Sequence, residues 1–166
     1  MNTNTQTVTN LQTQYNFALP ILKPLEVKAD FCAKVFGAQT DKKSIVLIAE
    51  EENDVFFLAC VNAINASETA QKHIVQVQTD LGLSENGELT KIETIAGVDL
   101  DTIYRINYFD LRSQLQTDDL IITKLPFLGL KNQLEIVQQL SERLRGEEAK
   151  LPRLVIIKRK AQSKNQ

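Results

Sequence analysis

The chain of 166 residues has little of what builds metal sites and covalent cross-links. It contains two cysteines, one histidine and no tryptophan. Cys32 and Cys60 both stand inside apolar segments, where a free cysteine behaves as a small hydrophobic residue. A single histidine and the absence of a CxxC pair argue against a zinc site. We therefore expect two reduced thiols in the core, and neither a metal nor a cofactor.

Long apolar runs and an excess of one charge are missing as well. No run approaches the roughly 18 residues that a membrane-spanning helix needs. The first residues, MNTNTQTVTNLQTQ, lack the basic and apolar regions of a signal peptide. The formal net charge of −2 is too small to attract nucleic acid over the whole surface. We therefore expect a cytoplasmic protein that does not insert into membranes and whose main partner is not nucleic acid.

The remaining composition suits one soluble domain. Hydrophobic residues make up 43% of the chain and charged residues 24%, which is ordinary for a globular protein. This length is enough to bury a core without disulfides. We predict a disordered polar arm over residues 1–16, a single domain over 17–158 and a disordered basic tail over 159–166.

Apolar spacing predicts three helices. The first covers residues 24–36, the second 67–81, and the third 130–145, where Gly146 ends it. The third is the clearest amphipathic helix of the chain. We expect its apolar stripe to face the core, and this stripe consists of Leu130, Leu134, Val137, Leu140 and Leu144.

The strands follow a different pattern. Residues 44–49 and 55–61 are nearly continuous apolar runs, which predicts a hairpin covered on both faces. Residues 102–109 alternate between apolar and polar side chains, so one face should be buried. Residues 88–95 carry charges, which are typical of an edge strand, and should form a hairpin with 102–109. We further predict a polar crossover over 110–117 and strands over 119–124 and 154–157.

Together these elements predict an α+β fold. The order is αββαβββα with an extra C-terminal strand. The sheet is five-stranded and mostly antiparallel, with helices on both faces, because the first hairpin is apolar throughout.

This order of elements resembles the roadblock/LC7 family, a relative of the longin and profilin-like folds, over about residues 25–146. The best local match is Phe127-Leu128-Gly129-Leu130-Lys131, which occupies the turn between the last strand and the final helix. The resemblance implies a five-stranded antiparallel sheet with one helix on one side and two on the other.

The resemblance also implies a function. Proteins of this family are non-enzymatic scaffolds that form homodimers, and they bind Ras-like small GTPases in motility or trafficking systems. On this chain the central helix would offer a partner-binding surface of Gln71, His73, Gln76 and Gln78. The edge strand would join two sheets at Lys91 and Glu93. The same side chains are also explained as ordinary solvent-facing residues.

Two other functions are weighed against the scaffold. A degenerate Rossmann-type methyltransferase would use residues 97–101 as an acidic strand end and 119–127 as the strand before its catalytic motif. The chain lacks the glycine-rich loop that holds such a cofactor, and Lys124 and Leu125 replace the required Asn and Pro. A nucleic-acid-binding module would combine Tyr104 and Tyr108 with the basic tail, but these tyrosines are better explained as core residues.

Overall fold

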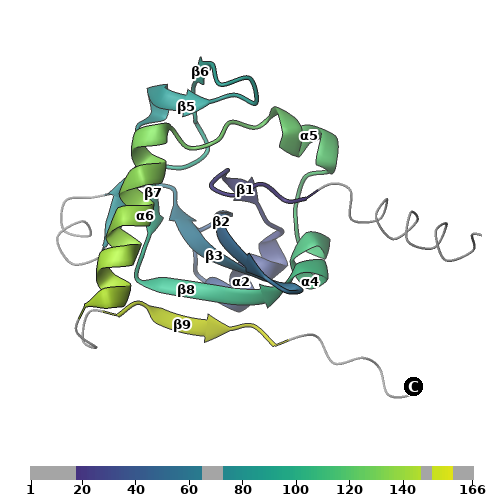
Figure 1. Ribbon diagram of the computed structural model, residues 1–166. Coiled ribbons are helices and arrows are strands. Elements are labelled where there is room, and N and C mark those ends of the chain that lie inside the picture. The colour runs from purple at the N-terminus through teal and green to yellow at the C-terminus, as the bar shows by residue number, and fades with distance from the viewer. Residues whose placement is uncertain (1–17, 65–72, 147–150, 159–166) are drawn as a thin grey trace, which may run out of the picture.

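The computed structural model describes residues 18–64, 73–146 and 151–158. These residues form a mixed α+β structure in which helices cover both faces of a mostly antiparallel sheet (Figure 1). This agrees with the predicted class. The predicted arm, the predicted tail and residues 67–72 of the predicted second helix lie outside the described residues.

The centre of the sheet is the predicted hairpin. Strand β2 (Ser44–Glu51) pairs antiparallel with β3 (Asp54–Val61), and β1 (Leu25–Glu26) pairs with the other edge of β2. The turn is shorter than expected, because the strands extend to Glu51 and Asp54. It therefore holds two residues, and Glu52 adopts a φ of 59°, the conformation that tight hairpins require.

Strand β3 is long enough to pair with two strands in succession. Its first half pairs with β8 (Thr102–Asn107), and its end pairs with β7 (Gly97–Asp99). Beyond them, β4 (Ile74–Gln76) pairs antiparallel with β7, and β9 (Arg153–Ile156) pairs parallel with β8. The strand predicted near residue 154 is thereby confirmed.

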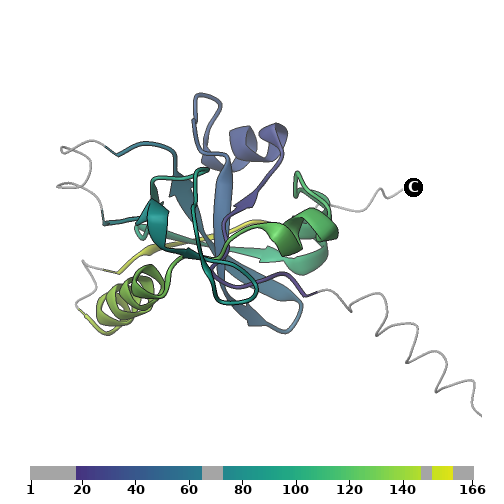
Figure 2. The same ribbon diagram turned by 90° about the horizontal axis from the view of Figure 1, so that it is seen from above.

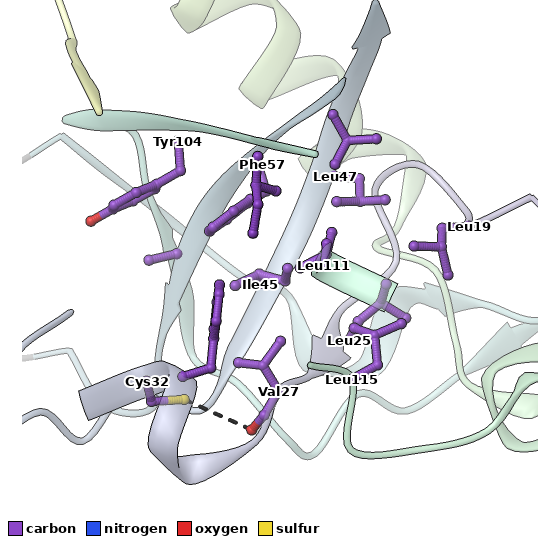
Figure 3. Close-up of a cluster of buried hydrophobic side chains, with 14 of the residues drawn as sticks. Leu19, Leu25, Val27, Cys32, Ile45, Leu47, Phe57, Tyr104, Leu111 and Leu115 are labelled. Atoms are coloured by element: carbon purple, nitrogen blue, oxygen red, sulfur yellow. Dashed lines mark hydrogen bonds between the residues drawn. The ribbon is translucent and has the colours of Figure 1, made fainter. Parts of the chain in front are cut away.

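One face of the sheet packs against α2 (Ala29–Phe36) and α4 (Tyr108–Ser113). Figure 3 shows this cluster, in which the ring of Phe57 stacks on Tyr104 with centroids 5.0 Å apart. Cys32 donates a weak hydrogen bond from Sγ to the carbonyl of Val27, 3.8 Å away. Tyr104 is only 7% exposed, so it is a core residue and does not offer a stacking surface.

The other face packs against α6 (Leu130–Arg145), as Figure 2 shows by placing α2 and α6 on opposite sides of the sheet. Residues 44–47 of β2 are all buried, since the alternate side chains of this strand enter the two clusters. The prediction that both faces of the hairpin are covered is confirmed. Both cysteines are buried and free, as expected.

Two predicted elements are wrong, which local capping explains, and a third begins later than predicted. Residues 119–124 form helix α5 (Asp119–Lys124), not a strand, because the side chain of Asp118 caps it by accepting a hydrogen bond from the backbone N–H of Ile121. The predicted crossover 110–117 begins inside α4, which Asn107 caps in the same way. The first helix starts at Ala29 rather than at residue 24.

The described part of the predicted second helix is not helical either. Residues 74–76 are strand β4, and only Thr79–Leu81 form a single 3-10 turn, η1. The period-two alternation of Val75-Gln76-Val77-Gln78 fits a strand better than the helical spacing that we used.

The predicted edge strand 88–95 is also mostly absent. Only β6 (Leu89–Thr90) is extended, and it pairs with β5 (Gly82–Leu83) in a separate two-stranded sheet. No pairing of β6 with β8 occurs, so the predicted hairpin of residues 88–95 with 102–109 is wrong.

The buried side chain of Lys23 links the loop between β5 and β6 to the rest of the domain. The Nζ atom of Lys23 is fully buried and donates to the Oε1 atom of Glu85 at 2.8 Å and to the carbonyl of Ile122 at 2.9 Å. It also lies 4.3 Å from the ring centre of Phe127. These contacts join the segment before β1 to α5 and to the loop between β5 and β6.

Candidate functional site: the exposed face of helix α6

Helix α6 begins and ends at the predicted residues, but the face that packs on the sheet is not the predicted apolar stripe. Asn132, Ile136 and Leu140 are its buried residues. Of the stripe predicted to face the core, only Leu140 does so. The other members are exposed: Leu130 61%, Leu134 60%, Val137 54% and Leu144 56%. The most apolar line along this helix therefore faces outward from the described domain.

The first cause of this orientation is Asn132, which is 1% exposed. Its Oδ1 atom accepts from the backbone N–H of Gln78 at 2.8 Å, and its Nδ2 atom donates to the carbonyl of Gln76 at 3.0 Å. The side-chain amide therefore pairs with backbone groups of Gln76, in β4, and of Gln78, two positions past it, as a neighbouring strand would. Sequence reasoning missed this residue, although its position four residues before Ile136 was a usable signal.

The second cause is Arg143, near the other end of the helix. Its Nη1 atom donates to the carbonyl of Leu100 at 2.6 Å and lies 3.3 Å from the Oδ1 atom of Asp101. Asn132 and Arg143 thus attach both ends of α6 to the sheet. Because both are polar and lie on the same side, they fix the rotation of the helix about its axis.

The outward residues have a regular spacing. Leu130, Leu134, Val137, Ser141 and Leu144, named here the α6 stripe, are separated by four, three, four and three positions. This average of 3.5 is the repeat by which two helices pack along a continuous seam. A helix that only covers a core needs no such repeat on its solvent side.

The α6 stripe begins next to Leu81, which is 39% exposed. A Cβ atom on residue 129 would collide with the backbone carbonyl of Leu81, so only glycine permits this close approach. Along the stripe the exposed flanking residues are Lys131, Gln138, Glu142 and Arg145. Beside the centre of the α6 stripe the flanking residue is the uncharged Gln138. Lys131 flanks its first end, and Glu142 and Arg145 flank its last end.

The described residues of the predicted partner-binding surface lie on or beside strand β4, not on a helix. Gln71 lies outside the described residues. Gln76 is exposed on β4, and Gln78 is half-buried, with a buried Oε1 atom that has no hydrogen-bond partner among the described residues. Lys91 and Glu93, predicted at a dimer edge, are exposed in the loop after β6, and they line a cavity of about 450 Å³ together with Pro24 and Pro126.

His73 has a defined partner. Its Nδ1 atom lies 2.9 Å from the Oδ1 atom of Asp101, and its backbone N–H donates to the Oδ2 atom at 3.3 Å. Burial disfavours the charge of Asp101, but the hydrogen bonds from His73 and the charges of His73 and Arg143 outweigh it and lower the pKa of this carboxyl. The group holds the β7–β8 junction to α6, which gives it a structural role.

The described residues offer little for metal or membrane chemistry. No three His, Cys, Asp or Glu side chains among them gather closely enough to hold a metal ion. None of the helices that the structure describes is long and apolar enough to cross a membrane.

Comparison of this chain with protein-family models, with curated proteins and with solved structures gave no match.

Proposed function

We propose that this protein is a non-enzymatic scaffold or regulatory adaptor that works as a homodimer, in which the α6 stripe of one copy packs against that of a second. The observation that supports this proposal is the exposure of four large apolar side chains at helix-pairing spacing. Single exposed apolar residues are common on soluble proteins, whereas a continuous line of them marks an interaction surface.

A second copy fits this surface because a straight seam is complementary to itself, as a two-fold interface requires. The exposed side of a 16-residue helix offers on the order of 500 Å² per copy. That area lies at the low end of specific interfaces, so the dimer should be weak and exchange readily. Such a dimer suits an adaptor that assembles and disassembles.

The charges next to the stripe are compatible with self-pairing. Gln138 flanks its centre and is uncharged, so no like charges meet there. In an antiparallel pair Lys131 of each copy lies toward the end of the other helix that carries Glu142 and Arg145, which are of opposite sign and compensate one another. The antiparallel arrangement also aligns the two helix dipoles favourably.

Light scattering of the purified chain over a concentration series tests the dimer. We expect the mass to rise toward twice that of the monomer at about 100 µM, as a weak interface of this size implies. Leu134→Glu and Val137→Glu should abolish the rise. The control is Leu120→Glu on α5, since Leu120 is 75% exposed and lies off the stripe. A strict monomer, or equal loss in the control, would contradict the proposal.

The further partner is taken from the family resemblance, which implies a Ras-like small GTPase or a component of a motility or trafficking complex. An affinity pull-down from the source cell, with the Leu134→Glu variant beside the native chain, tests this part. We expect a GTPase to be recovered with the native chain. Recovery of RNA or DNA instead would contradict this assignment of the partner.

A further inference from the structure

Strand β9 leaves one edge open. Among the described strands it pairs only with β8. The backbone N–H of Arg153 donates to the carbonyl of Asp101 at 2.8 Å, and that of Ile157 donates to Arg105 at 2.8 Å. In a parallel ladder alternate residues bond to the same neighbour, so the backbone groups of Leu154 and Ile156 point to the open edge.

A cavity of about 650 Å³ lies beside this edge, between β9 and helices α2 and α4. Its apolar lining consists of Phe31, Val35, Ile106, Val155 and Ile157. The volume lies within the range of sites that bind small ligands, so it has room for large side chains. A strand added to β9 would direct every second side chain to this face of the sheet.

The opposite face of β9 is apolar as well. Leu154 is 57% exposed and Ile156 62% exposed, and they stand on the side of the sheet that α6 covers elsewhere. An added strand would therefore meet apolar neighbours on both of its faces. This pattern favours an occupant that is apolar through its centre.

The charges at the two ends of β9 select the occupant. Arg153 precedes the apolar residues and Lys158 follows them, and the sequence continues with Arg159 and Lys160. An antiparallel pair of two β9 strands would set Arg153 of one copy opposite Lys158 of the other, which is unfavourable. Pairing of β9 with the β9 strand of a second copy is therefore disfavoured, whereas a strand with acidic residues at its ends would form ion pairs with Arg153 and Lys158.

The α2 and α4 side of the cavity carries charges of both signs. Asp30 and Asp110 line it together with Lys34, so that wall carries two carboxylates and one amine. Arg153 and Lys158, which stand at the two ends of the apolar run, outnumber the single excess carboxylate of that wall and set the preference for acidic ends.

We propose that β9 and the adjoining cavity form a strand-addition site for an extended segment of a different protein, apolar in its centre and acidic at its ends. Main-chain hydrogen bonds to β9 provide the affinity, and the cavity selects large side chains at alternate positions. The site is separate from the α6 stripe, so the two surfaces together would let a dimer carry two such segments.

The test uses a fluorescein-labelled synthetic peptide, Asp-Glu-Ile-Phe-Val-Phe-Ile-Asp-Glu, and the full chain. We expect anisotropy to show saturable binding that weakens as salt rises, because ion pairs at the ends are screened. A peptide with four lysines in place of the acids should bind at least tenfold more weakly. Equal binding of the two peptides, or no binding of the acidic one, would overturn the proposal.

The backbone contact is tested by Leu154→Pro. Proline removes an N–H that points to the open edge and leaves the bonds between β8 and β9 in place. We expect at least a tenfold loss of peptide affinity, whereas the control Leu154→Ala, which retains the N–H, should lose less than threefold. Circular dichroism and thermal unfolding identify a variant that fails to fold.

The Leu134→Glu variant on α6 separates this proposal from the proposed dimer. It should bind the peptide as the native chain does even when it is monomeric. Equal peptide binding by Leu154→Pro and the native chain would show that no strand is added to β9.

Discussion

The β2–β3 hairpin and helix α6 both carry a clear apolar pattern, and they place their apolar residues in opposite ways. In the hairpin every large apolar side chain over residues 44–47 and 57–61 is buried. In α6 the most apolar line is exposed, and a line containing an asparagine is buried. Apolar content alone therefore does not decide which side of an element faces the core.

The difference lies in what each element must satisfy. In this sheet helices cover both faces of the central strands, so the apolar side chains of β2 and β3 are buried whichever face they point to. A helix can rotate about its axis, and in α6 the polar contacts of Asn132 and Arg143 select the rotation. An unsatisfied buried polar group costs as much as an exposed leucine gains by burial, so polar contacts can outweigh the apolar stripe.

The largest effect should come from truncating the hairpin core. Phe57 is 0% exposed and packs against the rings of Tyr104 and Phe31. We expect Phe57→Ala to lower the free energy of unfolding by about 3–5 kcal/mol, through lost burial and a cavity. Leu134→Ala on the α6 stripe should change it by less than about 0.5 kcal/mol. Urea unfolding of dilute protein measures both, and equal effects would remove the contrast between the two elements.

The next effect should come from the contacts that orient α6. Asn132→Ala leaves the buried N–H of Gln78 and the carbonyl of Gln76 without their partner. We expect a loss of about 1–3 kcal/mol by chemical denaturation. Gln138→Ala, an exposed change on the same helix, serves as the control and should be close to neutral. A neutral Asn132→Ala would show that its hydrogen bonds do not set the rotation.

A smaller effect should appear in acid. The pKa of Asp101 is lower in the folded protein than in the unfolded chain, where it is about 3.9. Its stabilising contribution is therefore complete above that pH and is lost as the pH falls through the folded-state pKa. Thermal unfolding between pH 2 and pH 6 should show a shallower loss of stability in Asp101→Asn than in the native chain. Parallel curves would assign the acid sensitivity to other carboxyls.

The smallest effect concerns the thiols. Burial raises the pKa of Cys32 and Cys60, so neither forms the reactive thiolate in the folded protein at neutral pH. A colorimetric thiol reagent should label no cysteine in native buffer and two after denaturation. Rapid labelling of the native protein would show that the core around these residues opens readily.

Sequence reasoning succeeded where a local pattern matched one structure. The hairpin, the ends of α6 and the alternation of β8 were all predicted, because their signals lie within a few residues. It failed where two patterns competed. The apolar run of residues 120–122 suggested a strand, but the cap at Asp118 favoured a helix. In residues 74–78 a period of two and a helical spacing overlapped, and pairing with β7 selected the strand.

The candidate sites were less predictable than the fold. The exposure of the α6 stripe depends on Asn132 meeting the backbone at Gln76 and Gln78, more than fifty positions away. The open edge at β9 depends on its place outside β8, which no local pattern records.

The sequence by itself determined the α+β class, the central hairpin, the reduced buried thiols and the extent of helix α6, because these follow from local propensity and apolar periodicity. Only the tertiary structure decided which face of α6 is buried and which strand ends the sheet. The physical reason is that rotation and strand order depend on long-range hydrogen bonds and packing. Those contacts turned the most apolar stripe of α6 outward, from the expected core to the proposed contact surface.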